Sequence, residues 1–264
     1  MIALLCGWLL LHLLFFGTVS HARAQDLLYD DFRSKLAGLT APVGPVTPPG
    51  DPVAILRIPA LGLEEVVVEG TASGDLFAGP GHKRNTVLPG QTGISQVYGR
   101  STTYGAPFGG ISQLQRGDLI QLVTGQGEID LSVLGVRRDG DALPQPLAEG
   151  ATRLTLVTSE GDGPFAALAA GDAVYVDAES AEGFPAPGGV PPTVPQSEEA
   201  MERGVEALPL LTLYLGLLTA LTAAVVAAVQ RWDAVLVWVV ATPVALALCW
   251  ATTDAAMRLL PNLI

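Results

Sequence analysis

The sequence predicts a mainly β domain, a closed or nearly closed barrel of about 130 residues, joined to three transmembrane helices. Short β-prone runs separated by glycine and proline turns fill the middle of the chain, with little helical periodicity between them. Three long segments without any charged residue flank this region. The first observation predicts the barrel and the second predicts the helices.

The composition is too apolar for a wholly soluble protein. Of 264 residues, 49% are hydrophobic and only 15% are charged. Asp, Glu, Lys and Arg are absent from Met1–Val19, Leu208–Val229 and Ala234–Thr253. Each segment is close to the roughly 20 residues that cross a bilayer core. We therefore expect transmembrane helices at residues 1–20, 208–229 and 234–253.

The first segment has an alternative interpretation as a cleaved secretory signal, because Ala22-Arg23-Ala24 forms an A-x-A pattern. Against cleavage, the segment has no basic residue before its apolar run, which is also longer than a signal core needs. The uncleaved anchor is the interpretation favoured here.

Residues 21–52 are expected to hold a short juxtamembrane helix and a stalk. Asp26–Gly38 has apolar residues at helical spacing, with a disordered linker as the alternative. Thr40–Pro52 and Gly183–Gln196 are rich in proline, which favours extended spacers. The second of these lies in a linker expected at residues 181–207.

The predicted barrel covers residues 53–180. One run, Glu128–Leu134, alternates apolar and polar residues, as a half-buried strand does. It follows Asp118–Thr124 through a glycine-containing turn, which indicates a hairpin. The remaining expected strands are Ala54–Ile58, Glu64–Val68, Arg153–Thr158 and Ala173–Val176.

The net charge of −12 argues against nucleic acid as a partner, since phosphate binding needs clustered Lys and Arg. No metal site is predicted, because the cysteines and histidines lack ligand spacing. One acidic cluster offers a weak Ca²⁺ alternative, but its spacing matches no loop motif. Its members are Asp139, Asp141, Glu160 and Asp162. No cofactor is expected.

Two motifs carry a family resemblance. Thr155–Ser159 resembles the strand-end TLxTC signature of sortases, the cysteine transpeptidases of Gram-positive bacteria. Upstream, Leu88–Gln91 followed by a strand and then Thr102–Phe108, which reads TTYGAPF, resembles the region around the catalytic histidine of class E-like actinobacterial sortases. The resemblance runs from Ile55 to Ala178. It implies a sortase-type eight-stranded β-barrel.

The resemblance also implies that the catalytic residues are replaced. Sortase chemistry uses a thiolate nucleophile, a histidine for proton transfer and an arginine for the oxyanion. Ser159 stands at the cysteine position, Arg100 at the histidine position, and Ala173 at about the arginine position. The only cysteines, Cys6 and Cys249, lie in apolar segments. The chain is thus expected to be a pseudosortase without catalytic residues.

Two local alternatives remain open. Ser159 is a candidate serine nucleophile only if a base reaches it, and the predicted ectodomain has just His21 and His82. Arg100 either presents its charge in the former active-site groove or forms an ion pair with Glu160 or Asp162.

The function expected from these features is a membrane-anchored, non-catalytic peptide-binding or accessory subunit, with the barrel extracellular on a multi-pass protein. The alternative is a transpeptidase or hydrolase that uses Ser159 with a histidine from another chain. Expected partners are a membrane or envelope protein, a sorting-signal-like peptide and the lipid bilayer. A small-residue stripe on the second helix suits helix packing: Gly216, Ala220, Ala224 and Ala228. The expected groove residues are His82, Arg100, Thr103, Tyr104, Thr158 and Ser159.

Overall fold

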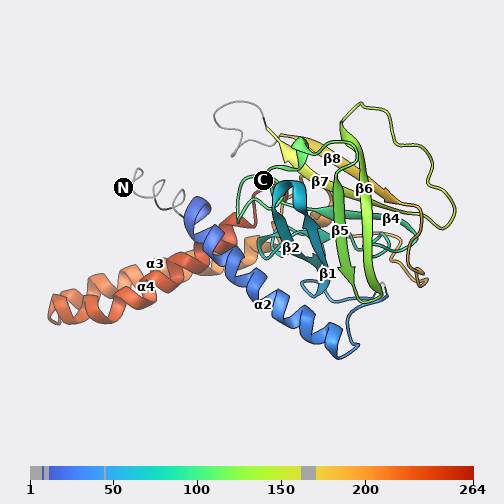
Figure 1. Ribbon diagram of the computed structural model, residues 1–264. Helices are drawn as coiled ribbons and strands as arrows, with labels where there is room; N and C mark the ends of the chain where they lie inside the picture. The colour runs from blue at the N-terminus through green and yellow to red at the C-terminus, as the bar shows by residue number, and fades with distance from the viewer. Residues whose placement is uncertain (1–7, 9–11, 45, 162–170) are drawn as a thin grey trace.

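The computed structural model describes residues 8, 12–44, 46–161 and 171–264, and its centre is a closed eight-stranded barrel (Figure 1). The strands follow one another around the barrel in the order β1-β2-β3-β4-β7-β8-β6-β5. The strands are β1 (Pro52–Ile58), β2 (Leu63–Glu69), β3 (Gly81–His82), β4 (Gly93–Tyr98), β5 (Leu119–Thr124), β6 (Gly127–Arg138), β7 (Thr152–Glu160) and β8 (Asp172–Ser180).

The strand pattern read from the sequence is confirmed. β5 and β6 form the expected antiparallel hairpin, with Thr124 paired to Gly127 at the turn. Leu131 and Val133 of β6 are buried in the barrel core, and Ile129 packs against that core. The alternation of apolar and polar residues along β6 thus identifies the face that points into the barrel, because successive side chains of a strand point to opposite faces.

Two strand pairings position the candidate site. β4 runs parallel to β7, with Tyr98 opposite Val157, so the residues that follow β4 lie beside the end of β7. β8 pairs antiparallel with β7 and sets Ala173 opposite Ser159. Positions far apart in the sequence therefore meet at one end of the barrel.

A long helix, α2 (Gly17–Ala37), lies along the outside of the barrel (Figure 1). The helix expected at Asp26–Gly38 is its second half. Phe32 is fully buried and packs with Ile55 of β1 and Val66 of β2. This contact removes the largest apolar side chain of α2 from water, so the segment is not a disordered linker.

The proline-rich stretches do not stand free as spacers. Val43 accepts a hydrogen bond from Gln91, and the Gly50 N–H donates to the main-chain oxygen of Glu69. In the second stretch, Phe184 forms a bridge with Gln91 and its N–H donates to Gly90. Both stretches are extended, as proline favours, but their backbone hydrogen bonds are made to the barrel.

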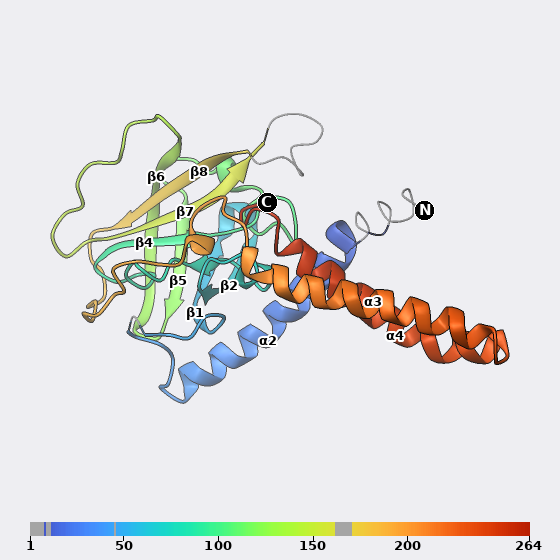
Figure 2. The same cartoon turned by 180° about the vertical axis from the view of Figure 1, so that it is seen from behind.

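Two helices, α3 (Leu208–Val229) and α4 (Ala234–Met257), form a hairpin that projects away from the barrel (Figure 2). Both are long and apolar enough to cross a membrane, and their side chains are largely exposed. Half of the third expected span, residues 1–20, falls outside the described residues. Two candidate spans are therefore present in the described part of the chain, and the count of three is not confirmed.

The described start of the chain packs against α4. The Trp8 indole N–H donates to the Thr253 hydroxyl at 3.0 Å, and the rings of His12 and Trp250 lie 4.9 Å apart. The short turn His12–Phe16 then leads into α2. The first and last helical segments thus meet beside the barrel.

Only part of the small-residue stripe of α3 lies next to α4. Ala224 and Ala228 line a cavity of about 240 Å³ between α3 and α4 near their connection. A side chain added at Gly216 would meet no atom within 4 Å. The stripe therefore borders an open groove at one end and faces outward at the other.

Candidate functional site

Ser159 lies near the end of β7, where the resemblance places a nucleophile, and its side chain is buried. Its hydroxyl oxygen lies 2.9 Å from the Ser101 hydroxyl oxygen and 2.9 Å from the main-chain oxygen of Leu263, to which it donates. Neither neighbour is a base at neutral pH. No described residue in hydrogen-bond contact with Ser159 can therefore remove its proton.

Arg100 follows β4 and has no exposed surface. Its guanidinium donates to Thr103, to the Ser73 hydroxyl and main-chain oxygen, and to the main-chain oxygen of Ile264. It also lies over the ring of Phe77, 4.7 Å from the centroid. Burial lowers the pKa of Arg100 to about 10, so the group stays protonated at neutral pH.

The expected alternative for Arg100, an ion pair with Glu160, is wrong. Glu160 instead pairs with Arg138, which donates two hydrogen bonds to the same carboxylate oxygen. Asp141 accepts the main-chain N–H of Arg138. Glu160 and Asp141 of the acidic cluster therefore both accept hydrogen bonds from Arg138. Asp162 lies outside the described residues.

The TTYGAPF loop shapes the floor of the site. Tyr104, Gly105 and Ala106 all have positive φ angles, which makes a tight turn of the backbone. The Tyr104 ring is buried and stacks on the ring of Phe77, with centroids 4.1 Å apart. Burial raises the pKa of the Tyr104 phenol. Phe108 lies so close to Gly99 that any side chain at Gly99 would overlap its ring.

Thr103 and Thr158 support the site in different ways. The Thr103 hydroxyl donates to the main-chain oxygen of Ile264, so it faces into the groove. The Thr158 hydroxyl donates to the main-chain oxygen of Gly99 at 2.9 Å. Thr158 therefore holds the loop after β4 against β7, and its hydroxyl has no role inside the groove.

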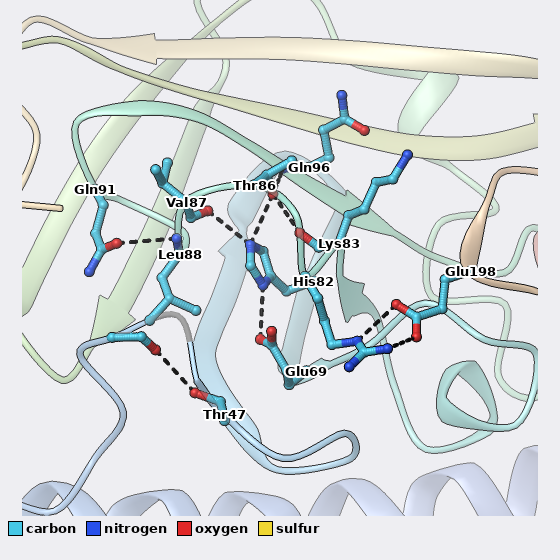
Figure 3. A network of polar contacts seen from close by, with 12 residues as sticks. Thr47, Glu69, His82, Lys83, Thr86, Val87, Leu88, Gln91, Gln96 and Glu198 are labelled. Carbon is cyan, nitrogen blue, oxygen red and sulfur yellow. Dashed lines mark hydrogen bonds and ion pairs between the residues drawn. The ribbon is translucent and has the colours of Figure 1, made fainter. Parts of the chain in front are cut away.

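His82 does not join the groove. It lies on β3, where its ring contacts Glu69 at 2.9 Å, Val87 at 2.8 Å and Thr86 at 3.0 Å (Figure 3). The side chain is buried and both ring nitrogens are engaged by these neighbours. The expectation that His82 lines the groove is wrong, because its ring is held in a separate polar network.

His21 is also committed elsewhere. From α2 its ring contacts the Glu65 carboxylate at 3.2 Å and the Phe77 main-chain oxygen at 3.2 Å. It packs against Gly105, where an added side chain would lie within 2.5 Å of the ring. His21 thus braces the TTYGAPF loop from outside and makes no described contact with Ser159.

Ala173 stands where the resemblance expects an arginine. It is opposite Ser159 in the β7–β8 ladder. A methyl side chain offers no positive charge and no hydrogen-bond donor to an oxyanion. Ser159 and Ala173 are thus adjacent in the ladder, and Ser159 and Arg100 contact the consecutive residues Leu263 and Ile264.

The sequence interpretation missed three participants. Ser73 and Ser101 are the partners of Arg100 and Ser159, and serine is too common in loops to mark either one. The third is the segment Leu260–Ile264, which lies against both key residues.

Comparison with known proteins points to one family. The family model described as sortase domain matches residues 56–163. Sortase D of Bacillus subtilis (strain 168) is 31% identical over 85 residues, which are 32% of this chain and 41% of that relative. The chain thus matches about two fifths of the length of that curated relative.

Two solved sortase structures are among those that this chain is similar to. A Clostridium perfringens sortase D5 transpeptidase has a TM-score of 0.46 at 20% identity, covering 61% of this chain and 98% of that one. Sortase E from Streptomyces avermitilis has a TM-score of 0.40 at 28% identity, covering 50% of this chain and 89% of that one.

Proposed function

We propose that this chain, whose barrel is a sortase domain, catalyses no transpeptidation and serves as a membrane-anchored peptide-binding or accessory subunit at the cell envelope. One observation carries the proposal. The Ser159 hydroxyl contacts only another hydroxyl and a main-chain oxygen among the described residues. A serine in that setting keeps its proton.

The chemistry of the two neighbouring positions supports the same conclusion. A hydroxyl is far less ionised than a thiol at neutral pH, so it needs a positioned base to attack a carbonyl. Arg100 stays protonated and cannot accept that proton. Its Nη atoms already donate to Ser73, Thr103 and Ile264. Ala173 supplies nothing to a developing oxyanion.

The helix hairpin supports membrane anchoring. The two ends of the hairpin are joined to each other, because Gly204 donates to Arg258 and Arg203 bridges to Pro261. They lie beside the barrel, because Ser159 and Arg100 donate to Leu263 and Ile264. The connection Gln230–Asp233 lies at the far end of the hairpin (Figure 2). We propose that the hairpin crosses the membrane twice, with the barrel on the outer side, where sortases act, and the connection in the cytoplasm.

A pair of assays tests the absence of catalysis. The purified full chain in mild detergent is incubated with a fluorophosphonate probe, and separately with an LPxTG-like peptide and a glycine nucleophile. We expect neither labelling at Ser159 nor cleavage or transfer of the peptide. Ser159→Ala is the matched control for both assays, and an active sortase is the positive control for the second.

Labelling or turnover that is lost in Ser159→Ala would instead establish the enzyme interpretation. A histidine supplied by another chain would then be the remaining source of a base, and it would be sought by repeating the assay in membranes. Turnover that survives Ser159→Ala indicates a contaminating enzyme.

A further inference from the structure

The segment Leu260–Ile264 follows α4 and enters the groove beside Ser159. Pro261, Asn262, Leu263 and Ile264 are all buried, and Asn262 and Leu263 have no exposed surface. Figure 2 shows α4 leading back to the barrel at this point. A sequence that comes from the end of an exposed apolar helix is therefore taken up inside the domain.

Apolar side chains of the segment pack in two clusters. Leu263 packs with Leu76, Tyr98 of β4 and Val157 of β7. Leu260 packs against Tyr104 of the TTYGAPF loop. Burying a leucine side chain stabilises such a contact by removing apolar surface from water. The two leucines lie at the first and fourth positions of the segment.

The main chain of the segment is held by the residues at the former catalytic positions. The Leu263 oxygen accepts from the Ser101 N–H at 2.9 Å and from the Ser159 hydroxyl at 2.9 Å, and lies 3.1 Å from the Ser101 hydroxyl. The Ile264 main-chain oxygen accepts from Arg100 at 2.6 Å and from Thr103. These contacts do not depend on the side chains of the segment.

Asn262, which precedes Leu263, is hydrogen-bonded to the barrel side and to the linker before α3. Its amide N–H groups donate to the main-chain oxygens of Thr71 and Glu199, each at 2.9 Å. Its own N–H donates to the main-chain oxygen of Glu202. A carboxylate at this position would present oxygen to oxygen, so the site discriminates Asn from Asp.

Ordinary packing of a helix end does not account for this arrangement. A helix end needs partners for its last carbonyls, whereas Leu263 and Ile264 lie beyond α4 and meet donors from two separate parts of the barrel, the loop after β4 and the end of β7. The buried donors also need the segment: without it, Arg100 and Ser159 would each lose an acceptor. Leaving a buried donor without an acceptor is destabilising.

We propose that the groove at Ser159 and Arg100 is a peptide-binding site occupied by the chain's own segment Leu260–Ile264. The ligand class is a short peptide with the order Leu-Pro-Asn-Leu followed by an aliphatic residue, bound as a turn in which the N–H of the last residue donates to the main-chain oxygen of the proline, as Ile264 does to Pro261. The bound segment excludes peptides of this class from other proteins. The inference deepens the proposed function, on which it rests for the absence of turnover.

The test measures binding of a fluorescent peptide, Leu-Pro-Asn-Leu-Ile with both ends capped, to the full chain in detergent. The release variant is Leu263→Asp, whose carboxylate is costly to bury and drives the segment out. We expect the release variant to bind the peptide about tenfold or more tightly than the unmodified chain, because its site is no longer filled.

Two controls isolate the groove. Leu143→Asp makes the same chemical change at a side chain that is 76% exposed, and should bind as weakly as the unmodified chain. A peptide with Asp in place of its second leucine should not bind any variant. Equal binding to the unmodified chain and the release variant, or no binding to a release variant whose barrel gives an unchanged circular dichroism spectrum, overturns the proposal.

A second measurement needs no variant and covers the case in which Leu263→Asp fails to fold. Hydrogen–deuterium exchange of the unmodified chain reports the N–H groups of Asn262 and Ser101, which donate to Glu202 and Leu263. We expect both peptides that contain them to exchange at least about a hundredfold more slowly than an unfolded chain. Exchange of the 260–264 peptide at the unfolded rate overturns the proposal.

Peptide cleavage is followed in the same samples, so the two proposals fail separately. Binding without cleavage supports both. Binding with cleavage keeps the ligand class and contradicts the non-catalytic function. Absence of binding and cleavage contradicts the ligand class alone.

Discussion

Ser101 and Ser159 face each other with their hydroxyl oxygens 2.9 Å apart, and both lie within hydrogen-bond distance of the Leu263 main-chain oxygen. Ser159 comes from the end of β7, and Ser101 from the loop after β4. The position that would hold an attacking group is therefore already part of a neutral hydrogen-bonded set. A cysteine placed at position 159 would therefore have, among the described residues, only hydroxyl and main-chain oxygen neighbours, and no base.

Ser159→Cys alone should create no transpeptidase. A thiol at this position still lacks a histidine, and the arginine position still holds Ala173. We expect cleavage of an LPxTG-like peptide, followed by chromatography, to stay at the background of the unmodified chain. Ser101→Cys is the matched control, since it places a thiol 2.9 Å away from the same point. Turnover by Ser159→Cys and not by Ser101→Cys would contradict the prediction.

Arg100→Met should destabilise the barrel strongly. It leaves acceptors at Ser73, Thr103 and Ile264 without their donor in a buried region. We expect a loss of about 2–4 kcal/mol of folding free energy. That loss corresponds to a melting temperature lower by on the order of 5–15 °C, followed by circular dichroism.

Arg57→Met is the control for Arg100→Met. Arg57 pairs with Glu64 on the barrel surface, where its side chain is about one third exposed. An exposed pair of this kind contributes less than about 1 kcal/mol. Equal losses for the two variants would show that the network around Arg100 adds no stability.

Asp75→Asn should stabilise the protein at neutral pH and not in acid. Burial, and then the negative charge of Glu198, raise the pKa of Asp75 to about 6 from an ordinary 3.8, against the lowering effects of Arg84 and Arg258. Below pH 3.8 the carboxyl is neutral in both states and burial carries no charge penalty. Above about pH 6 the folded state bears the whole penalty.

The gain from Asp75→Asn therefore grows between about pH 4 and pH 6 and then stays constant. Its upper limit is about 3 kcal/mol, from 1.36 kcal/mol per pKa unit. Melting temperatures measured from pH 4 to pH 8 check the curve. Asp139→Asn, on an exposed turn, should shift stability by less than about 0.5 kcal/mol throughout. A gain that is largest in acid would contradict the assignment.

The barrel could be predicted because its signals are local. Alternation in β6 and the turn at Gly125–Gly127 identify a hairpin without knowledge of the rest of the chain. The strands that carry Ser159 and Ala173 were expected from their own residues, whereas the pairing of these two residues is known only from the structure. The alternation of apolar residues and the residue types of a turn depend only on neighbouring residues, so the sequence shows them directly.

The contents of the groove could not be predicted in the same way. Contacts between Leu263 and Ser159 join residues 104 positions apart, and a buried tail has no periodicity that distinguishes it from a polar linker. The placement of His82 failed for a related reason. A two-residue strand, β3, sets its direction, and nothing in Gly81-His82 indicates that the ring turns toward Glu69.

The last prediction concerns the side of the membrane on which each part lies. α3 has 22 residues, or about 33 Å at 1.5 Å per residue, which matches a bilayer core of about 30 Å. Both ends of the hairpin that adjoin the barrel must share its side, because Leu263 and Ile264 are hydrogen-bonded within it. The connection at Gln230 should then lie on the other side.

Cysteine labelling in intact cells checks this arrangement. We expect Leu143→Cys, on an exposed barrel loop, to react with a membrane-impermeant maleimide, and Gln230→Cys to react only after permeabilisation. The unmodified chain gives the background from its own cysteines. If Gln230→Cys reacts in intact cells as fast as Leu143→Cys, the hairpin does not cross the membrane. The apolar surfaces of α3 and α4 would then have to be covered by a partner protein on the barrel's side.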